Sequence, residues 1–226
     1  MVPLAPRLID VAAPREPAGV AIVLHGGASR RNAMRVSPAQ LSVLRMIPVA
    51  RRVARATSHR VAVLRLLNSR RGWETEHTPV RDVGWALEQV AERFGGELPV
   101  CLVGHSLGGR AALLSAGERQ VAGVVALAPW VSPSDVPRHV DGKPVVIIHG
   151  DEDRIASPQR SREVATRLAR SAPVAYVSVG GGTHAMLRHR RAFDGLAARC
   201  AAWILLGRVR GDTVRRIAAG ETLLTL

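Results

Sequence analysis

Residues 99–112 read Pro-Val-Cys-Leu-Val-Gly-His-Ser-Leu-Gly-Gly-Arg-Ala-Ala, and this stretch decides the fold class. An apolar run after a proline is typical of a short strand buried on both faces of a sheet. The alanines and leucines after the glycine pair favour a helix. Between them, Gly104-x-Ser106-x-Gly108 predicts a serine in a tight turn from strand to helix. Such a turn needs a positive φ at the serine and leaves little room for side chains two residues away, which suits glycine.

Stretches typical of buried strands alternate with stretches typical of helices along the whole chain. The expected strands are residues 8–12, 20–24, 61–67, 100–103, 121–128, 144–149 and 174–179. The expected helices are residues 37–56 (interrupted or kinked at Pro48), 79–94, 157–171 and 185–206, besides the one after Ser106. This alternation predicts an α/β fold with a mostly parallel sheet covered by helices on both faces. We expect one domain over residues 1–226, with its core at about 20–206 and a C-terminal tail of unclear form at 207–226.

The composition is that of a globular protein with a large positive charge. The chain has 226 residues, 47% of them hydrophobic, and a formal net charge of +14. Lys143 is its single lysine, and its arginines are dispersed rather than gathered in a basic tract. Because no nucleic-acid recognition motif accompanies them, no specific nucleic-acid partner is expected. The charge would still attract anionic substrates or membrane surfaces in a general way.

Two further features of the sequence indicate the cellular compartment of the protein. Cys101 and Cys200 lack the spacing of metal ligands and are interpreted as reduced core residues. No apolar run reaches membrane-spanning length, and the first residues lack the apolar segment of a signal peptide. We therefore expect a cytoplasmic protein without a transmembrane segment.

The turn around Ser106 resembles the nucleophile elbow of the α/β-hydrolase family. In that family a serine attacks the substrate, a histidine takes its proton, and an acid orients the histidine. The resemblance covers about residues 20–206. It implies a serine hydrolase, and the remaining members of its site should follow other strands, because sites in parallel sheets form beyond the carboxyl ends of the strands.

Eight histidines compete for the role of base. His25 and His149 each precede a glycine at a strand end, while the geometry of the elbow should point His105 away from Ser106. Four others lie in polar contexts typical of the surface: His59, His77, His139 and His189. His184 follows three glycines just after the last expected core strand, and it comes last in chain order, as the family's histidine does. The resemblance therefore selects His184.

The acid and the oxyanion donors follow from the same resemblance. Asp151, Glu152 and Asp153 are adjacent after the strand at 144–149, and the family's Gly-x-x-Asp pattern before a helix selects Asp153. An Asp153 oxygen should then lie within about 3.2 Å of a His184 ring nitrogen. Residues 24–28, Leu-His-Gly-Gly-Ala, resemble the family's oxyanion loop. We expect the N–H groups of Leu107 and Gly27, with Ala28 as a near alternative, to stabilise the charge on the reacting oxygen.

The resemblance thus implies hydrolysis of a small-molecule carboxylic ester through an acyl-enzyme, with no cofactor and no metal. The stretch between Trp130 and Pro144 is too short for a cap domain, as in small cap-free esterases and dienelactone-hydrolase-like proteins. Without a cap, loops including Trp73 and Trp130 should wall the acyl pocket and favour short acyl groups. Three alternatives stay open: cleavage of a thioester, lactone or amide, or acyl transfer, on the same triad; a binding module without chemistry; and an anion- or membrane-binding protein.

Overall fold

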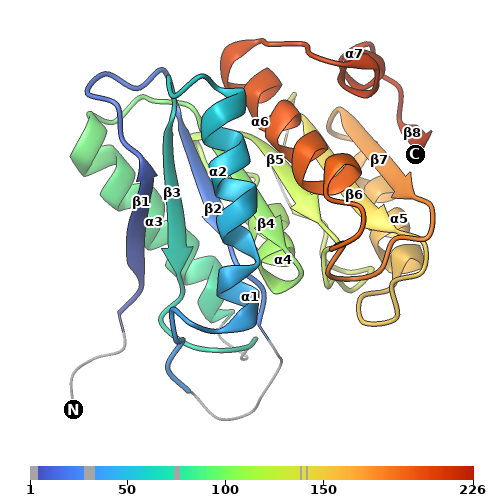
Figure 1. Cartoon of the computed structure of the whole chain (residues 1–226), viewed down its shortest axis with the longest axis horizontal. Helices are drawn as coiled ribbons and strands as arrows, with labels where there is room; N and C mark the ends of the chain where they lie inside the picture. The colour runs from blue at the N-terminus through green and yellow to red at the C-terminus, as the bar shows by residue number, and fades with distance from the viewer. Residues whose placement is uncertain (1–4, 28–33, 74–76, 138, 141) are drawn as a thin grey trace.

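The computed structural model describes residues 5–27, 34–73, 77–137, 139–140 and 142–226. Within these ranges eight strands form one sheet in the order β1-β3-β2-β4-β5-β6-β7-β8 (Figure 1). Their bounds are β1 Arg7–Ala12, β2 Val20–Leu24, β3 Ala62–Leu67, β4 Val100–His105, β5 Val121–Leu127, β6 Val145–Gly150, β7 Val174–Val179 and β8 Leu223–Thr225. Strand β1 is antiparallel to β3, and the remaining neighbours run parallel. The predicted, mostly parallel sheet is confirmed.

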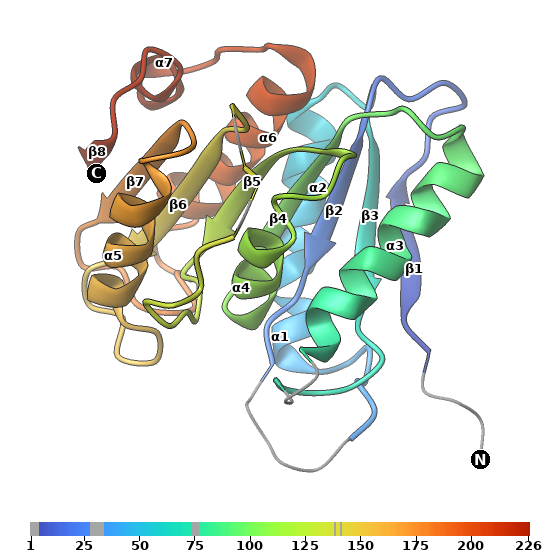
Figure 2. The ribbon, with the colours of Figure 1, turned by 180° about the vertical axis from the view of Figure 1, so that it is seen from behind.

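Helices cover both faces of this sheet. Helices α2 (Met46–Ala56) and α6 (Leu196–Leu206) lie on the face toward the viewer in Figure 1, with α1 (Leu41–Leu44) at one end. Helices α3 (Thr78–Phe94), α4 (Leu107–Leu114) and α5 (Pro158–Leu168) cover the opposite face, as Figure 2 shows. Each side has its own apolar core, because successive strand residues point to opposite faces.

Two expected helices begin later than the sequence indicated. Residues 37–40 form a turn, and α1 begins at Leu41. A short break at Arg45 separates α1 from α2. Pro48 lies in the first turn of α2 and does not kink it, because the N–H that proline lacks would have no partner within the helix there. The helix expected from residue 185 begins with a π-helical turn, Arg191–Gly195, before α6. Met186, with φ of 51°, lies in the left-handed region and is incompatible with a helix at that position.

The chain after residue 206 has a regular form that the sequence left open. Helix α7 (Asp212–Ala218) leads to β8, which pairs with β7 through Tyr176 and Leu223 and so extends the sheet. Within the link from Trp130 to Pro144, the described residues form turns and extended chain, with no helix or strand. Cys101 in β4 and Cys200 in α6 are free thiols with no exposed surface, so both are core residues as predicted.

Candidate active site

Ser106 occupies the turn between β4 and α4 in the strained conformation that the sequence predicts. Its φ is 56° and its ψ is −119°. A Cβ atom on Gly104 would overlap the backbone of Gly108. A Cβ on Gly108 would lie 2.6 Å from the carbonyl oxygens of Leu24 and His25, at the end of β2. The first glycine therefore permits the turn itself, and the second permits the close approach of the neighbouring strand.

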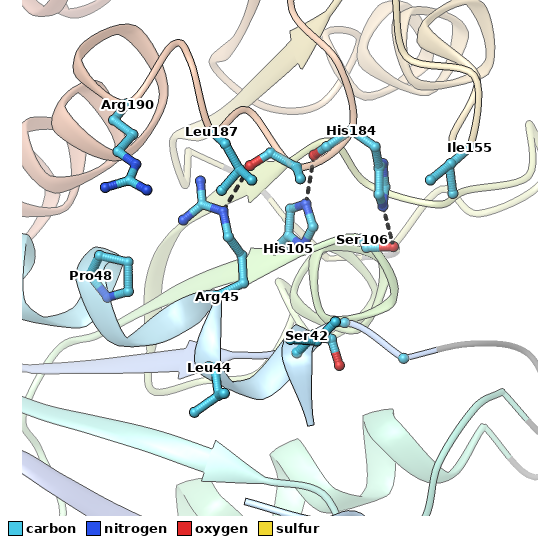
Figure 3. Close-up of a pocket in the computed structure, with 14 residues that line it drawn as sticks. Ser42, Leu44, Arg45, Pro48, His105, Ser106, Ile155, His184, Leu187 and Arg190 are labelled. Carbon is cyan, nitrogen blue, oxygen red and sulfur yellow. Dashed lines mark hydrogen bonds between the residues drawn. The ribbon is translucent and has the colours of Figure 1, made fainter. Parts of the chain in front are cut away.

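The ring of His184 connects Ser106 to Asp153. Its Nε2 lies 3.0 Å from Ser106 Oγ, and its Nδ1 lies 2.7 Å from Asp153 Oδ2. The contact expected between Asp153 and His184 is thus present. The other ring nitrogen of His184 faces Ser106, as Figure 3 shows. The three residues come from the ends of β4, β6 and β7, whose carboxyl ends meet at one edge of the sheet.

The Asp153 carboxylate is buried and surrounded by N–H donors. Its Oδ1 accepts from the backbone N–H groups of Ile155 and Ala156, at 2.8 and 2.9 Å. Its Oδ2 lies 2.7 Å from His184 Nδ1 and 3.1 Å from His149 Nε2. Burial by itself would raise the pKa of Asp153, but the hydrogen bonds from His149 and His184 outweigh it and hold that pKa well below its usual range. The carboxylate therefore stays ionised at neutral pH, as a group that orients a histidine must.

The other two acids of this turn do not reach His184. Asp151 and Glu152 are exposed. Their backbone N–H groups donate to Val179 O at 3.2 Å and Gly182 O at 3.0 Å, which fixes the turn against β7 and the glycine-rich loop. Of the three adjacent acids, Asp153 is the one whose side chain is buried and contacts His184.

The expected oxyanion donors lie beside each other. Leu107 is the first residue of α4, so its N–H has no partner within the helix. A Cβ on Gly27 would be 3.8 Å from Leu107 Cδ1, so the two residues are neighbours. In the described part of the chain, the Gly27 N–H has no hydrogen-bond acceptor. The alternative donor, Ala28, lies outside the described residues.

His25, which the sequence placed at a strand end without a role, supports the oxyanion loop. Its Nδ1 lies 2.6 Å from Gly26 O, and its Nε2 accepts from the backbone N–H of Asn68 at 3.2 Å. Burial lowers the pKa of His25, so the ring stays neutral and can donate from one nitrogen while accepting at the other.

His105 and His149 support the other two loops. His105 points away from Ser106, as expected, and its Nε2 lies 3.0 Å from the backbone oxygen of His184 (Figure 3). Burial, together with the neighbouring His184, lowers the pKa of His105 to about 3, so the neutral ring donates this hydrogen bond. His149 is fully buried and contacts Asp153. The signal that could have identified these residues is their shared position, each at the carboxyl end of an apolar strand.

A cavity of about 610 Å³ adjoins Ser106 and His184. Its apolar walls come from α1, α2 and two loops: Leu41, Leu44, Pro48, Ile155 and Leu187. Trp73 and Trp130, which were expected to wall the acyl pocket, do not line this cavity. Both rings instead flank the guanidinium of Arg110, with centroids 4.0 and 5.5 Å from its Cζ. In this cavity the two tryptophans therefore provide no reason for a preference for short acyl groups.

Metal-ligand clusters and membrane-spanning helices are both absent from the described residues. No cluster of three or more His, Cys, Asp or Glu side chains is arranged to hold a metal ion within them. Across the same residues, no helix combines the length and apolar character needed to cross a membrane.

Comparison with known proteins shows the family and the fold of this chain. A model described as the alpha/beta hydrolase family matches residues 21–143, and no curated protein matches the sequence. An alpha-beta serine hydrolase homologue from Coxiella burnetii is 17% identical, with a TM-score of 0.63, over 86% of this chain and 91% of its own. Est1E from Butyrivibrio proteoclasticus is 18% identical, with a TM-score of 0.60, over 89% and 93%. An esterase from Pyrobaculum calidifontis is 15% identical, with a TM-score of 0.63, over 88% and 84%. At these identities the likeness concerns the fold alone.

Proposed function

Because this chain belongs to the alpha/beta hydrolase family, we propose that it is a serine hydrolase that cleaves carboxylic esters. Ser106 is the nucleophile, His184 the base and Asp153 the group that orients it. One observation carries the proposal: the two nitrogens of a single imidazole lie 3.0 Å from a strained serine hydroxyl and 2.7 Å from a buried carboxylate. That arrangement activates a hydroxyl that is otherwise a weak nucleophile.

The reaction proceeds in two halves. Ser106 Oγ attacks the ester carbonyl while its proton passes to His184 Nε2, and the N–H groups of Gly27 and Leu107 stabilise the oxyanion. The intermediate collapses, and the alcohol leaves with the proton from His184. Water then attacks the acyl-enzyme, gives its proton to the same nitrogen, and releases the carboxylic acid and free Ser106. The ionised Asp153 stabilises the imidazolium that forms in both halves.

The ester assignment rests on the similar structures rather than on the geometry of the triad. One of the three similar structures described above, from Pyrobaculum calidifontis, is named an esterase, and this favours esters over other acyl substrates. The same residues could cleave a thioester, lactone or amide, or transfer the acyl group to an alcohol. Parallel assays with matched p-nitrophenyl ester, thioester and anilide substrates, with and without added alcohol, separate these activities.

A fluorophosphonate probe tests the nucleophile directly, because it labels only an activated serine. Wild-type protein should be labelled, and Ser106→Ala should lose both the label and ester hydrolysis, by on the order of 10⁴-fold. Ser42→Ala is a matched control, since this hydroxyl also lines the cavity but contacts Gln40 at 2.6 Å. An unchanged melting temperature in Ser106→Ala would assign the loss to chemistry. Retained labelling of that variant would refute the proposal.

A further inference from the structure

The cavity beside Ser106 is apolar but carries positive charge. Arg45 and Arg190 both line it, and its described lining residues include no carboxylate. The Arg45 side chain is mostly buried, and a buried charge is costly without a partner, whereas Arg190 is exposed to solvent.

Arg45 is explained by the fold. Its guanidinium lies 2.6 Å from Asp194 Oδ1, and its Nε donates to Ala185 O at 2.8 Å. The Asp194 side chain has no exposed surface, and Arg52 also lies 3.9 Å from it. Arg45 therefore neutralises a buried carboxylate and fixes the start of the loop after His184. Its charge is already compensated.

Arg190 has no such partner. Among the described residues, its guanidinium forms no hydrogen bond, ion pair or ring contact. It lies at the opposite side of the cavity from Ser106, with Arg45 and Leu187 between them in the view of Figure 3. The only carboxylate close to it in sequence, Asp194, is occupied by Arg45. Arg190 is thus an exposed, unpaired cation at the far end of an apolar cavity whose other end holds Ser106.

We propose that the cavity binds esters whose apolar chain carries an anionic group, a carboxylate, at the end remote from the scissile bond. This rests on the ester hydrolase function proposed above. The ester group would lie at Ser106, the chain against Leu44, Pro48 and Leu187, and the carboxylate at Arg190. A guanidinium presents a planar fork of donors that matches a carboxylate in two parallel hydrogen bonds. Because Arg190 is exposed, water and salt partly screen this pair.

Paired substrates of equal length test this assignment. One series consists of p-nitrophenyl esters of dicarboxylic acids with a free terminal carboxylate, and the other carries a neutral terminal carboxamide, over a range of chain lengths. A second pair of series places the carboxylate or carboxamide on the alcohol. At the best chain length, we expect kcat/KM of wild-type protein to favour the anionic ester by about tenfold, equivalent to about 1.4 kcal/mol.

Substitutions assign the preference to Arg190. Arg190→Gln should abolish it by raising KM for the anionic ester, with kcat little changed, because the contact exists in ground and transition states alike. Arg190→Glu should reverse it. Arg188→Gln is the matched control, since Arg188 is exposed and close in sequence but does not line the cavity. The preference should also weaken at high salt.

The outcomes separate this inference from the function on which it rests. If no ester is hydrolysed and the fluorophosphonate does not label Ser106, the proposed function is wrong. If neutral esters are hydrolysed but neither pair of series shows a preference for the carboxylate over the carboxamide, the function stands and the inference is overturned. A preference that survives in Arg190→Gln, or disappears equally in Arg188→Gln, overturns it as well.

Discussion

His149 lies behind Asp153, with its Nε2 3.1 Å from the Oδ2 atom that His184 also contacts. Its own Nδ1 is 2.7 Å from the buried hydroxyl of Ser161 in α5. The carboxylate is therefore held from a core strand as well as by the backbone of its own turn. Such support fixes the direction in which Asp153 presents its charge to His184.

We expect His149→Leu to lower kcat by about ten- to hundredfold, because a buried carboxylate loses one of its donors. Nε2 of His149 also lies 3.2 Å from Ala156 O, so the same substitution loosens the turn. His149→Gln retains an N–H donor and should restore a large part of kcat. A melting temperature that falls equally in both variants, with equal kcat, would contradict a positioning role.

Asp153→Asn should lower kcat by about 10⁴, because the amide keeps the shape but favours the wrong imidazole tautomer. Asp151→Asn should cost far less, since this side chain is exposed and outside the hydrogen-bond chain. Steady-state kinetics on one p-nitrophenyl ester compare the two. If the effects were exchanged, Asp151 would be the orienting acid.

Gly108→Ala should destabilise the fold by at least about 1–3 kcal/mol and abolish activity, because two carbonyl oxygens lie 2.6 Å from the new Cβ. Gly84→Ala is the matched control in α3, where nothing lies within 4 Å of the added atom. It should stabilise the protein by about 0.5–1 kcal/mol and leave activity unchanged. Urea unfolding and one activity assay measure both effects. If Gly108→Ala were as stable and as active as wild-type protein, β2 and the turn at Ser106 could move apart without loss of stability or activity.

Asp153 should also make stability depend on pH. Its pKa is lower in the folded protein than the ordinary value of 3.8, so its contribution is complete above that pH. The contribution is lost as pH falls from about 3.8 toward the folded pKa. The difference in unfolding free energy between wild-type protein and Asp153→Asn should therefore shrink below pH 3.8. A constant difference down to strongly acidic pH would show that the folded pKa is not lowered.

The sequence by itself determined the alternation of strands and helices and the strained turn at Ser106. Both are local properties, since apolar periodicity and glycine at fixed offsets need no knowledge of distant residues. The pairing of Asp153 with His184 followed from chain order and resemblance to a family, and the contact is present. The late start of α1 was missed, and the interruption expected at Pro48 lies instead at residue 45, because proline is tolerated in the first turn of a helix.

Only the tertiary structure decided what surrounds the triad. His105 contacts the backbone of His184, a residue 79 positions later, and His25 accepts from Asn68, 43 positions later. Local patterns carry no information on contacts across such distances. Trp73 and Trp130 were placed in the pocket because they follow strands, yet both flank Arg110. The cavity was built instead by Arg190 and the apolar side chains of α1 and α2, which meet because the parallel sheet brings its loops to one edge.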